Sequence, residues 1–465
     1  MRLFGHHISR QTLVLAGVEI LLIVASLEFA LIQLFQELDH QGALLGINLA
    51  LALIMVLLME TIGLYDREAH AQVGSEGLDD ILRIAAALLM TLAGIALIAP
   101  TLPFPLPTVE TIGFATGLVF LVLALERLIY RRISRSNAFA RRILVLGSGS
   151  RAMTLETAST HANAHNPYKI LAFVAIETKE PGEVPANRVI RLEHGQSLLQ
   201  LARSVKTEEI VVAIRERRNS LPIKDLLECK LQGITVTDIS TFFEREHQRL
   251  QLDSMNSSWL VFGSGFRQSW FGNVVKRVFD LLLSLVLLLV AAPVMLLTII
   301  AIKLEGPGPI LYWQTRVGLG NKPFEICKFR SMRPDAEKDG QPRWAASDDD
   351  RITRVGRVIR TLRIDELPQI FNVLRGEMSF IGPRPERPIF VDQLSKQIPY
   401  FLARHSIRPG ISGWAQVRYP YGASVQDAKE KLQYDLYYVK NHTLFLDILI
   451  LLETVKVVLF GRGAR

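Results

Sequence analysis

The chain has 465 residues, of which 49% are hydrophobic, and a formal net charge of +8. The length suits about three domains of roughly 150 residues each, and the hydrophobic share is high for a purely soluble protein. A basic balance is typical of proteins that bind nucleic acid, anionic lipid or a phosphorylated substrate. Because the apolar residues gather before Tyr130 and again in residues 278–302, we expect a membrane protein with soluble parts and no nucleic-acid partner.

Four apolar segments come first, each near the roughly 20 residues that a helix needs to cross the hydrocarbon core of a bilayer. They comprise residues 13–35, 43–64, 81–99 and 112–128. The connections 36–42 and 100–110 carry no Lys or Arg, whereas six arginines follow between Arg127 and Arg142. The positive-inside rule therefore predicts that both ends of this module, residues 1–135, face the cytoplasm. Three acidic residues within the segments predict helix–helix contacts more than a functional site: Glu19, Glu28 and Glu60.

Residues 136–253 alternate between strand-like and helix-like patterns. The predicted strands are 143–147, 170–176, 210–214 and 234–237, and the predicted helices are 198–205 and 223–232. This βαβ alternation predicts a Rossmann-like domain with a parallel sheet. The following linker, residues 254–273, contains Trp259 and Trp270, a composition that is compatible with the membrane interface.

A fifth apolar segment lies within residues 274–304. Lys276 and Arg277 precede its apolar run and Lys303 follows it, so a crossing helix would place the basic remainder of the chain outside the cell, against the positive-inside rule. Pro293 removes a backbone hydrogen bond near the middle and kinks a helix. We therefore predict a re-entrant helical hairpin on the cytoplasmic face, with a crossing helix as the alternative.

The last part, residues 305–465, predicts a mainly helical domain. It ends in the apolar stretch 444–460, which Asp447, Glu453 and Lys456 interrupt. That spacing favours a helix lying in the membrane interface over a spanning one.

A glycine turn, Gly147 and Gly149, follows the first strand of the Rossmann-like domain. This is the context of a dinucleotide-binding fingerprint, but Ala152 replaces the third glycine and no acidic residue lies about 20 residues further on. Glu177, at the end of the next predicted strand, is the nearest substitute for that residue. No redox dyad lies beside the turn. It is thus a weak candidate nucleotide site, and a regulatory site or a structural, dimerising domain are the alternatives.

Two adjacent carboxylates, Asp365 and Glu366, precede a predicted helix that runs to Arg375 and stops at Gly376. Pro368 fits the first turn of that helix, and Asp365 is a plausible N-cap. The N-terminus of a helix also favours phosphate. A Mg²⁺ ion held by one carboxylate and by substrate phosphates would compensate the repulsion, and the other carboxylate could then attack phosphorus.

Basic residues surround this dyad in the sequence. Five arginines recur every third residue before it, on the side of a helix opposite three apolar residues: Arg351, Arg354, Arg357, Arg360 and Arg363, opposite Val355, Val358 and Leu362. We expect most of these arginines to form a solvated face and Arg360 to clamp phosphate oxygens. Lys328 and Arg330 are further candidates, and Arg384 lies between two prolines in a segment that suits preorganised phosphate binding.

A series of motifs in this order resembles the bacterial sugar transferase family, the monotopic polyisoprenyl-phosphate hexose-1-phosphate transferases. The motifs are Lys276-Arg-Val-Phe-Asp280, Lys328-Phe-Arg-Ser-Met332, Asp365-Glu-Leu-Pro-Gln369, Phe371-Asn-Val-Leu374, Gly376-Glu-Met-Ser-Phe-Ile-Gly-Pro-Arg-Pro385 and Arg408-Pro-Gly-Ile-Ser-Gly-Trp-Ala-Gln416. The front half resembles the long, undecaprenyl-phosphate glucose phosphotransferase branch, and the linker around Trp259 resembles members associated with PEP-CTERM/exosortase exopolysaccharide systems.

The resemblance implies a function and roles. Asp365 would attack the sugar-bearing phosphorus of a UDP-sugar with release of UMP, Glu366 would help to bind Mg²⁺, and Lys328, Arg360 and Arg384 would contact phosphate. Undecaprenyl phosphate would then accept the hexose-1-phosphate, glucose-1-phosphate by the family's pattern, and begin exopolysaccharide or glycoconjugate assembly. Membrane lipids, a second copy of the chain and downstream glycosyltransferases would be its partners. A non-catalytic scaffold of a polysaccharide assembly complex and a nucleotide-sugar-modifying Rossmann enzyme are the alternatives.

Overall fold

The computed structural model describes most of the chain. The described residues are 2–3, 6–7, 10–34, 41–65, 76–101, 108–135, 140–161, 167–176, 181–192, 197–215, 221–255, 265–266, 269–333, 351–419, 422 and 424–460. The chain divides into two compact units, one formed mainly by residues 8–242 and the other by residues 243–465 together with 2–7, where β1 (Arg2–Leu3) pairs with β2 (His6–His7).

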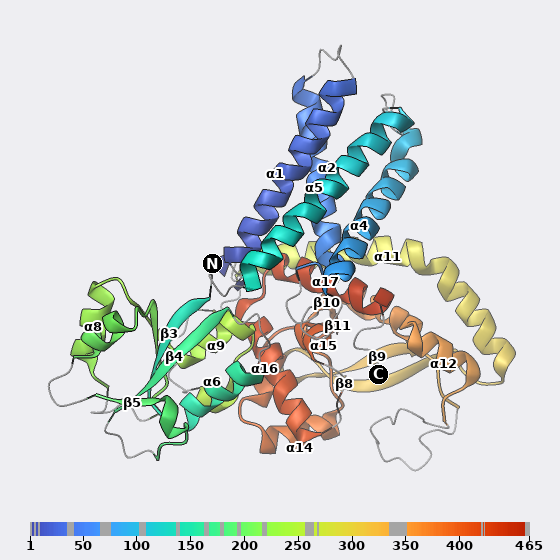
Figure 1. The fold of residues 1–465 in the computed structure, drawn as a ribbon. Helices are drawn as coiled ribbons and strands as arrows, with labels where there is room; N and C mark the ends of the chain where they lie inside the picture. The colour runs from blue at the N-terminus through green and yellow to red at the C-terminus, as the bar shows by residue number, and fades with distance from the viewer. Residues whose placement is uncertain are drawn as a thin grey trace. The chain divides into compact units, whose positions relative to one another are not determined.

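The first unit begins with a helical bundle (Figure 1). Its helices are α1 (Arg10–Leu34), α2 (Gln41–Thr61), α4 (Glu76–Ile98), which the 3-10 helix η1 (Ala99–Thr101) extends, and α5 (Val109–Arg135). Four described stretches of the chain are long and apolar enough to cross a membrane. Three of them lie in this bundle, Thr12–Ile32, Asp79–Thr101 and Val109–Ile133, and the fourth is Trp270–Glu305 in the second unit. The described side chains of α2 form a shorter apolar helix, Leu45–Thr61.

Acidic residues inside the bundle contact neighbouring helices. Arg127 lies 2.5 Å from Glu19, and the amide of Asn48 donates to Glu28 at 2.8 Å. Glu19 and Arg127 are both buried. The expected helix–helix contacts are therefore confirmed for these two glutamates, since burying a charge requires a partner of this kind.

A five-stranded parallel sheet follows, in the order β5-β4-β3-β6-β7 (Figure 1). The strands are β3 (Arg141–Leu146), β4 (Tyr168–Ala175), β5 (Val189–Arg191), β6 (Glu209–Val212) and β7 (Thr235–Asp238). The helices are α6 (Ser150–His161), η2 (Ala186–Arg188), α7 (Leu198–Ser204), α8 (Ile223–Leu231) and α9 (Ile239–His247). Continuous apolar runs form the central strands because helices cover both faces of such a sheet. The βαβ prediction is confirmed; the sequence pattern missed β5, which is only three residues long.

The glycine turn after β3 is used by the fold itself. Gly147 has a φ of +121°, and a Cβ there would lie 3.2 Å from the carbonyl of Ala213. The Ser148 carbonyl accepts from the amides of Glu183 and Val184, at 2.8 and 3.2 Å, and Gly149 accepts from Met153 in the first turn of α6. These contacts give both glycines a structural role, and the nucleotide site stays a prediction whose acidic residue, at position 177, lies outside the described residues.

The second unit begins with the end of α9 and η3 (Leu252–Ser254), followed by α11 (Trp270–Glu305), a single helix of 36 residues that contains Pro293. Figure 1 shows a bend between its two halves. An ideal straight helix of this length would extend about 54 Å, well beyond the roughly 30 Å of a bilayer core. The structure therefore has a single bent helix in this region, and the interior proline is the ordinary cause of such a bend. The re-entrant path through the membrane stays a prediction.

A mixed, mainly helical domain completes the unit. Its elements are β8 (Leu311–Val317), η4 (Leu319–Asn321), β9 (Pro323–Phe329), α12 (Arg354–Thr361), η5 (Ile364–Gln369), α13 (Ile370–Arg375), β10 (Ser379–Ile381), α14 (Pro388–Gln397), η6 (Phe401–Ser406), β11 (Gly410–Ser412), α15 (Trp414–Arg418), α16 (Val425–Asn441) and α17 (Leu444–Phe460). β8 and β9 form an antiparallel hairpin, and β10 pairs in parallel with β11. The core includes Val373, Phe380, Trp414 and Tyr437.

Two charged residues of helix α17 are buried inside the second unit. Asp447 and Lys456 are both buried, and Asp447 accepts from Lys276 at 2.7 Å and from the Tyr438 hydroxyl at 2.5 Å. These two charged side chains are therefore buried inside the unit, and the position of the helix in the membrane interface stays a prediction. Asp447 binds other parts of the same unit.

Candidate active site

The two carboxylates lie in a tight turn between two helices. Helix α12 ends at Thr361, Arg363 adopts a left-handed conformation with a φ of +57°, and the 3-10 helix η5 then carries Asp365 and Glu366 into α13. The N-cap of η5 is Arg363, so the prediction that Asp365 caps the helix is wrong. The left-handed residue reverses the chain and starts the helix before Asp365 is reached. Gly376, with a φ of +83°, ends α13 as predicted.

Glu366 is compensated by cations. Its Oε1 lies 2.9 Å from Lys328 Nζ, 2.9 Å from Arg384 Nη2 and 3.8 Å from Arg363 Nη1. Burial alone would raise the pKa of Glu366, but Lys328 and Arg384 outweigh it and hold this pKa well below its usual range. Burial in turn lowers the pKa of Lys328, although Glu366 opposes that shift. Glu366 is therefore a carboxylate kept ionised by its surroundings.

Asp365 has a different environment. In the described part of the chain its carboxylate makes no hydrogen bond or ion pair, although the side chain is only 8% exposed. Burial raises its pKa, while Lys328 and Arg360 partly offset that effect. Two adjacent carboxylates thus differ in charge compensation, which is the arrangement that separates the roles of paired acids in active sites.

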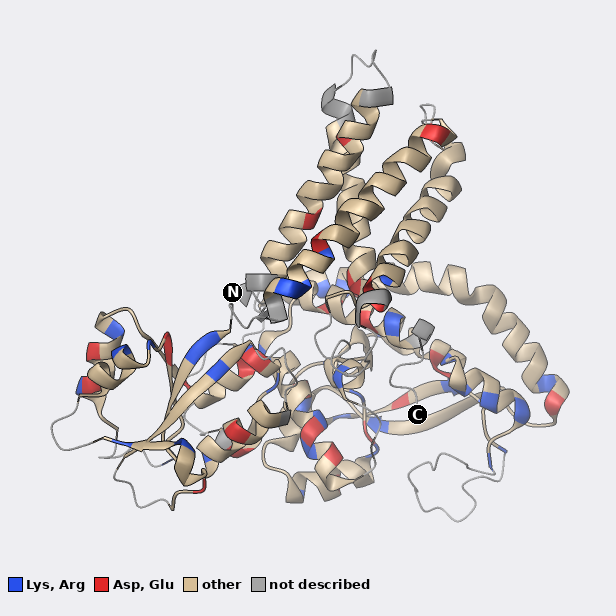
Figure 2. Ribbon diagram, viewed as in Figure 1, with Lys and Arg blue, Asp and Glu red and all other residues tan. Residues whose placement is uncertain are grey.

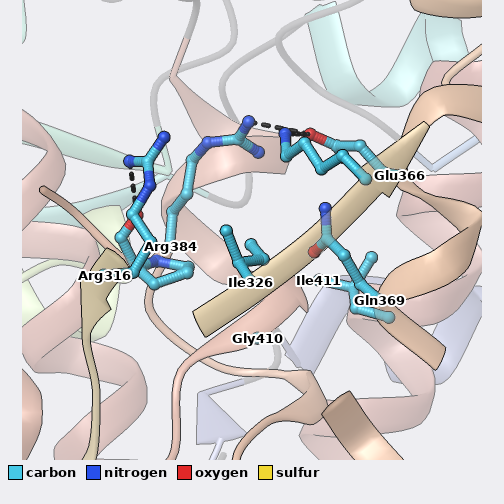
Figure 3. A pocket seen from close by; sticks show the side chains of 9 residues that line it. Arg316, Ile326, Glu366, Gln369, Arg384, Gly410 and Ile411 are labelled. Atoms are coloured by element: carbon cyan, nitrogen blue, oxygen red, sulfur yellow. Dashed lines mark hydrogen bonds and ion pairs between the residues drawn. The ribbon is translucent and has the colours of Figure 1, made fainter. Parts of the chain in front are cut away.

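A small pocket opens beside Glu366 (Figure 3). Its lining residues are Arg316, Ile326, Lys328, Glu366, Gln369, Arg384, Pro385, Gly410 and Ile411. Arg316 comes from β8, and its Nη1 donates to the carbonyl of Pro385 at 3.0 Å. Burial lowers the pKa of Arg316, an effect that Glu386 opposes. The pocket therefore concentrates three basic side chains around one carboxylate, a setting that suits a polyphosphate.

Close backbone packing holds the Arg384 segment in place. The amide of Gly382 donates to Ser412 at 2.9 Å, and the amide of Gly410 donates to Pro383 at 3.0 Å. A Cβ on Gly382 would meet the Arg408 carbonyl and lie 2.8 Å from the nitrogen of Gly410. Only glycine allows this approach, which explains the glycines of the two motifs.

A buried ion pair between Arg404 and Asp435 contacts the backbone of Arg384. Arg404 donates to the carbonyl of Arg384 at 2.9 Å and lies 2.8 Å from Asp435. Both side chains are at most 6% exposed, and burial raises the pKa of Asp435 to about 6. The sequence analysis did not single out Arg316, Arg404 or Asp435. An arginine in the middle of a strand was the one available signal, at Arg316.

The other predicted residues fall into two groups. The structure brings Lys328, Arg384 and Glu366 together, and Arg360 lies close enough to lower the pKa of Asp365. Arg330 is placed elsewhere: its guanidinium donates to the carbonyls of Ile302, Gly306 and Pro307 at 2.8–3.2 Å. This geometry favours a role for Arg330 in fixing the end of α11.

Two arginines of helix α12 are exposed to solvent, as expected, and so are two of its apolar residues. Arg354 and Arg357 are exposed, and Figure 2 shows basic residues along this helix and the neighbouring hairpin of β8 and β9. Val358 and Leu362 are also exposed, at 57% and 54%. Gly356 and Ile359 make the close contacts of α12 instead.

The donor set allows a hard cation only with help from a substrate. Among the described residues there is no group of three or more His, Cys, Asp or Glu side chains that could hold a metal by themselves. The ion pairs of Glu366 in the described part of the chain all end on Oε1, and Asp365 adds a second carboxylate. One or two carboxylates completed by phosphate oxygens is the usual protein site for Mg²⁺, so the residues fit this ion.

Long apolar helices, a five-stranded parallel sheet and a buried carboxylate pair among basic side chains define a class: membrane proteins with a site that suits phosphate esters. Residues 271–461 match the family described as bacterial sugar transferase. This chain belongs to that family. Its relatives include the UDP-glucose:undecaprenyl-phosphate glucose-1-phosphate transferase of Caulobacter vibrioides, which is 46% identical over 184 residues, 39% of this chain and 68% of the relative.

Two longer relatives extend the comparison. The UDP-N-acetylgalactosamine-undecaprenyl-phosphate N-acetylgalactosaminephosphotransferase of Aeromonas hydrophila is 46% identical over 240 residues, 52% of this chain and 56% of the relative. The undecaprenyl-phosphate glucose phosphotransferase of Komagataeibacter xylinus is 44% identical over 194 residues, 41% of this chain and 36% of the relative. The matches thus span about half or less of the length of these two relatives.

Proposed function

We propose that this protein transfers a hexose-1-phosphate from a UDP-sugar to undecaprenyl phosphate in the bacterial inner membrane and releases UMP. The observation that carries the proposal is the unequal pair of carboxylates: Lys328 and Arg384 bind Glu366, whereas Asp365 makes no hydrogen bond in the described part of the chain. The names of the relatives support the two substrates. They mention both glucose and N-acetylgalactosamine, so both belong in the test.

The chemistry would take two steps. An oxygen of Asp365 attacks the sugar-bearing phosphorus, the bond from that phosphorus to the bridging oxygen breaks, and UMP leaves with the electron pair. A phosphate oxygen of undecaprenyl phosphate then attacks the same phosphorus, and the bond to Asp365 breaks, which restores the carboxylate. Splitting a transfer in this way is the logic of covalent catalysis. Lys328, Arg384 and Arg360 would stabilise the charge on the phosphoryl oxygens in both steps.

Mg²⁺ bound by Glu366 and the diphosphate would neutralise charge on the leaving UMP. The protein's own contribution is to keep the carboxylate of Glu366 ionised and to hold the carboxylates of Glu366 and Asp365 in place. Lys328 and Arg384 keep Glu366 ionised at neutral pH, so one carboxylate stays available to a cation. Asp365 stands one residue earlier on the 3-10 turn, so its side chain leaves the helix in a different direction from that of Glu366.

The contacts of α11 support a re-entrant path in the membrane. At its first turns Arg277 donates to the carbonyls of Val373 and Leu374 at 2.5 and 2.7 Å. At its last turn Glu305 accepts from the amide of Val355 at 2.9 Å, and Arg330 binds the carbonyl of Gly306. Both ends of one helix thus contact the same domain. If that domain is cytoplasmic, both ends are cytoplasmic, and the bent helix dips into the bilayer and returns.

The test of the chemistry is UMP release by the purified full chain in nanodiscs with Mg²⁺, undecaprenyl phosphate and a panel of UDP-sugars. We expect release with one sugar, loss of that release on chelation of the metal, and no radiolabelled phosphosugar on Asp365→Asn. The matched control is Asp392→Asn, an exposed carboxylate that pairs with Lys396 on the surface; this variant should label normally. Normal turnover by Asp365→Asn would refute the assignment of the nucleophile.

The test of the topology is a cysteine in place of Lys303, with Cys229 and Cys327, which are both buried, retained as internal controls. We expect a membrane-impermeant maleimide to label Lys303→Cys in inverted vesicles and not in intact spheroplasts. Labelling from the periplasmic side would mean that α11 crosses the membrane.

A further inference from the structure

Residues 243–255 lie before the part of the chain that matches the family, yet they belong to the second unit. We call the segment Phe243–Met255 the strap. Leu250 and Leu252 are 1% and 8% exposed and join the same core cluster as Trp414 and Leu436. The amide of Leu250 donates to the carbonyl of Gln433 in α16 at 3.1 Å. The strap is therefore an interior part of the domain that carries the active site.

A buried ion pair fixes the first part of the strap. Glu244 Oε2 lies 2.6 Å from Lys440 Nζ, and Glu244 Oε1 accepts from Asn441 at 3.0 Å. The side chains of Glu244 and Lys440 are 4% and 3% exposed. Buried charges of this kind are retained only with well-placed partners. Arg249, further along, lies 2.7 Å from Glu430 on the same helix α16.

Between these two anchors the chain makes a specific main-chain contact. Gln248 has a φ of +52°, a left-handed conformation that non-glycine residues rarely adopt. In this conformation its carbonyl accepts from the indole nitrogen of Trp414 at 2.9 Å. Trp414 is only 1% exposed, so its N–H needs an acceptor inside the protein. Gln248 supplies that acceptor from outside the family-matched region.

Trp414 in turn adjoins the wall of the active-site pocket. It directly follows Gly413, which caps α15 and whose Cα lies against the carbonyl of Gly382. Gly410 and Ile411, four and three residues before Trp414, line the pocket beside Glu366. The same segment pairs through Ser412 with Gly382, two residues before Arg384. The position of Trp414 thus bears on both walls that face Glu366.

We propose that the strap is a positioning element of the active site. The left-handed conformation of Gln248 places its carbonyl to accept from the indole of Trp414, and the position of Trp414 in turn fixes the pocket wall at residues 410–412. Gln248 and Trp414 are positioning residues in this scheme and do not touch the substrate. The activity readout rests on the proposed function, whereas the exchange readout below does not.

The test compares two substitutions at Gln248 in the full chain in nanodiscs. Glycine adopts the left-handed conformation freely and keeps the carbonyl where it is. Valine is β-branched and disfavours that conformation, by about tenfold or more in population, so it should displace the carbonyl. Amide hydrogen exchange of residues 408–416 and the kcat/KM of UMP release are measured for both.

We expect Gln248→Val to speed exchange in residues 408–416 and to lower kcat/KM by about tenfold, and Gln248→Gly to preserve both within about twofold. In a Trp414→Phe background, which lacks the donor and keeps an aromatic ring, Gln248→Val should add no further loss, because the two residues act through one bond.

Two results would overturn the proposal. Equal damage from glycine and valine would assign the effect to the Gln248 side chain. A Gln248→Val protein whose faster exchange stays within the strap, with unchanged exchange in residues 408–416, would show that the strap does not position the pocket wall. If the unsubstituted protein released no UMP from any sugar, the proposed function would fall, and the exchange comparison would still decide the positioning.

Discussion

Glu366 is a buried carboxylate that two cations compensate, and its neutralisation has a measurable consequence. Its Oε1 lies 2.9 Å from both Lys328 Nζ and Arg384 Nη2, and the residue is 8% exposed. Glu366→Gln places a neutral amide between two cations that are held in position by the surrounding fold. We therefore predict that this substitution lowers the free energy of unfolding at pH 7.

The magnitude follows from the burial of the three side chains. Removing one partner of a buried ion pair costs about 3–5 kcal/mol. The side chains of Lys328 and Arg384 are 18% and 33% exposed, so solvent screens part of the loss, and we expect about 2–3 kcal/mol. At about 2–4 °C per kcal/mol for a domain of this size, the Tm should fall by about 4–12 °C.

The sign of the pH dependence is also fixed. The pKa of Glu366 is lower in the folded than in the unfolded protein, so its stabilising contribution is fully present above the unfolded value and is lost as the pH falls through the folded value. The difference in Tm between the unsubstituted protein and Glu366→Gln should be constant near neutral pH and shrink below about pH 4.5.

Thermal unfolding in detergent, followed by tryptophan fluorescence, measures the effect. The control is Glu386→Gln, whose side chain is 30% exposed and lies 3.8 Å from Arg316; it should cost less than about 1 kcal/mol. Lys328→Met in the Glu366→Gln background removes the uncompensated ammonium and should recover part of the loss. An unchanged or higher Tm for Glu366→Gln would mean that repulsion from Asp365 outweighs the attraction of the cations.

Three further predictions concern the second unit. Gly382→Ala should lower the Tm by the equivalent of about 1–3 kcal/mol because a Cβ would press on the Arg408 carbonyl, whereas Gly306→Ala, which meets open space, should not. Burial holds the pKa of both His247 and His405 at about 4, so stability should fall as the pH drops from 6.5 towards 4, by about 2 kcal/mol per histidine at pH 5, and His405→Gln should remove its share in pH-dependent thermal unfolding. Arg330→Lys should lower the Tm without raising the KM for the UDP-sugar, because an ammonium cannot bind three carbonyls as a guanidinium does; a raised KM with an unchanged Tm would return Arg330 to the phosphate site.

Patterns with a single physical cause were predictable from the sequence. Length and apolarity located the helices of the bundle, and alternation of strand and helix located the parallel sheet, because both depend on local composition. The stop of α13 at Gly376 was predictable for the same reason, since a left-handed end favours glycine. The sequence missed the three-residue strand β5, which carries too little periodicity to be recognised.

The site divided along the same line. Asp365, Glu366 and Lys328 were found because charged residues in an apolar setting stand out, and the structure places two of them 2.9 Å apart. Arg330 lies two residues after Lys328, directly past the end of β9, and looked equivalent to it in the sequence. In the structure it binds carbonyls at the end of α11 instead. Contacts over long sequence separations, such as Arg404 with the Arg384 carbonyl, leave no local trace. They are set by packing, which a single sequence does not encode position by position.

The different surroundings of Asp365 and Glu366 follow from the directions in which their side chains leave the 3-10 helix. Successive residues on a 3-10 helix differ by about 120°, so neighbouring side chains leave η5 in different directions. That geometry takes Glu366 to Lys328 on β9 and to Arg384, while Asp365 makes no hydrogen bond in the described part of the chain and has its pKa raised by burial. If the helix began two residues later, Asp365 would be its N-cap, and its carboxylate would accept a hydrogen bond from a backbone amide of the first turn. The left-handed Arg363 starts the turn early, so Asp365 does not cap the helix, and its surroundings differ from those of Glu366.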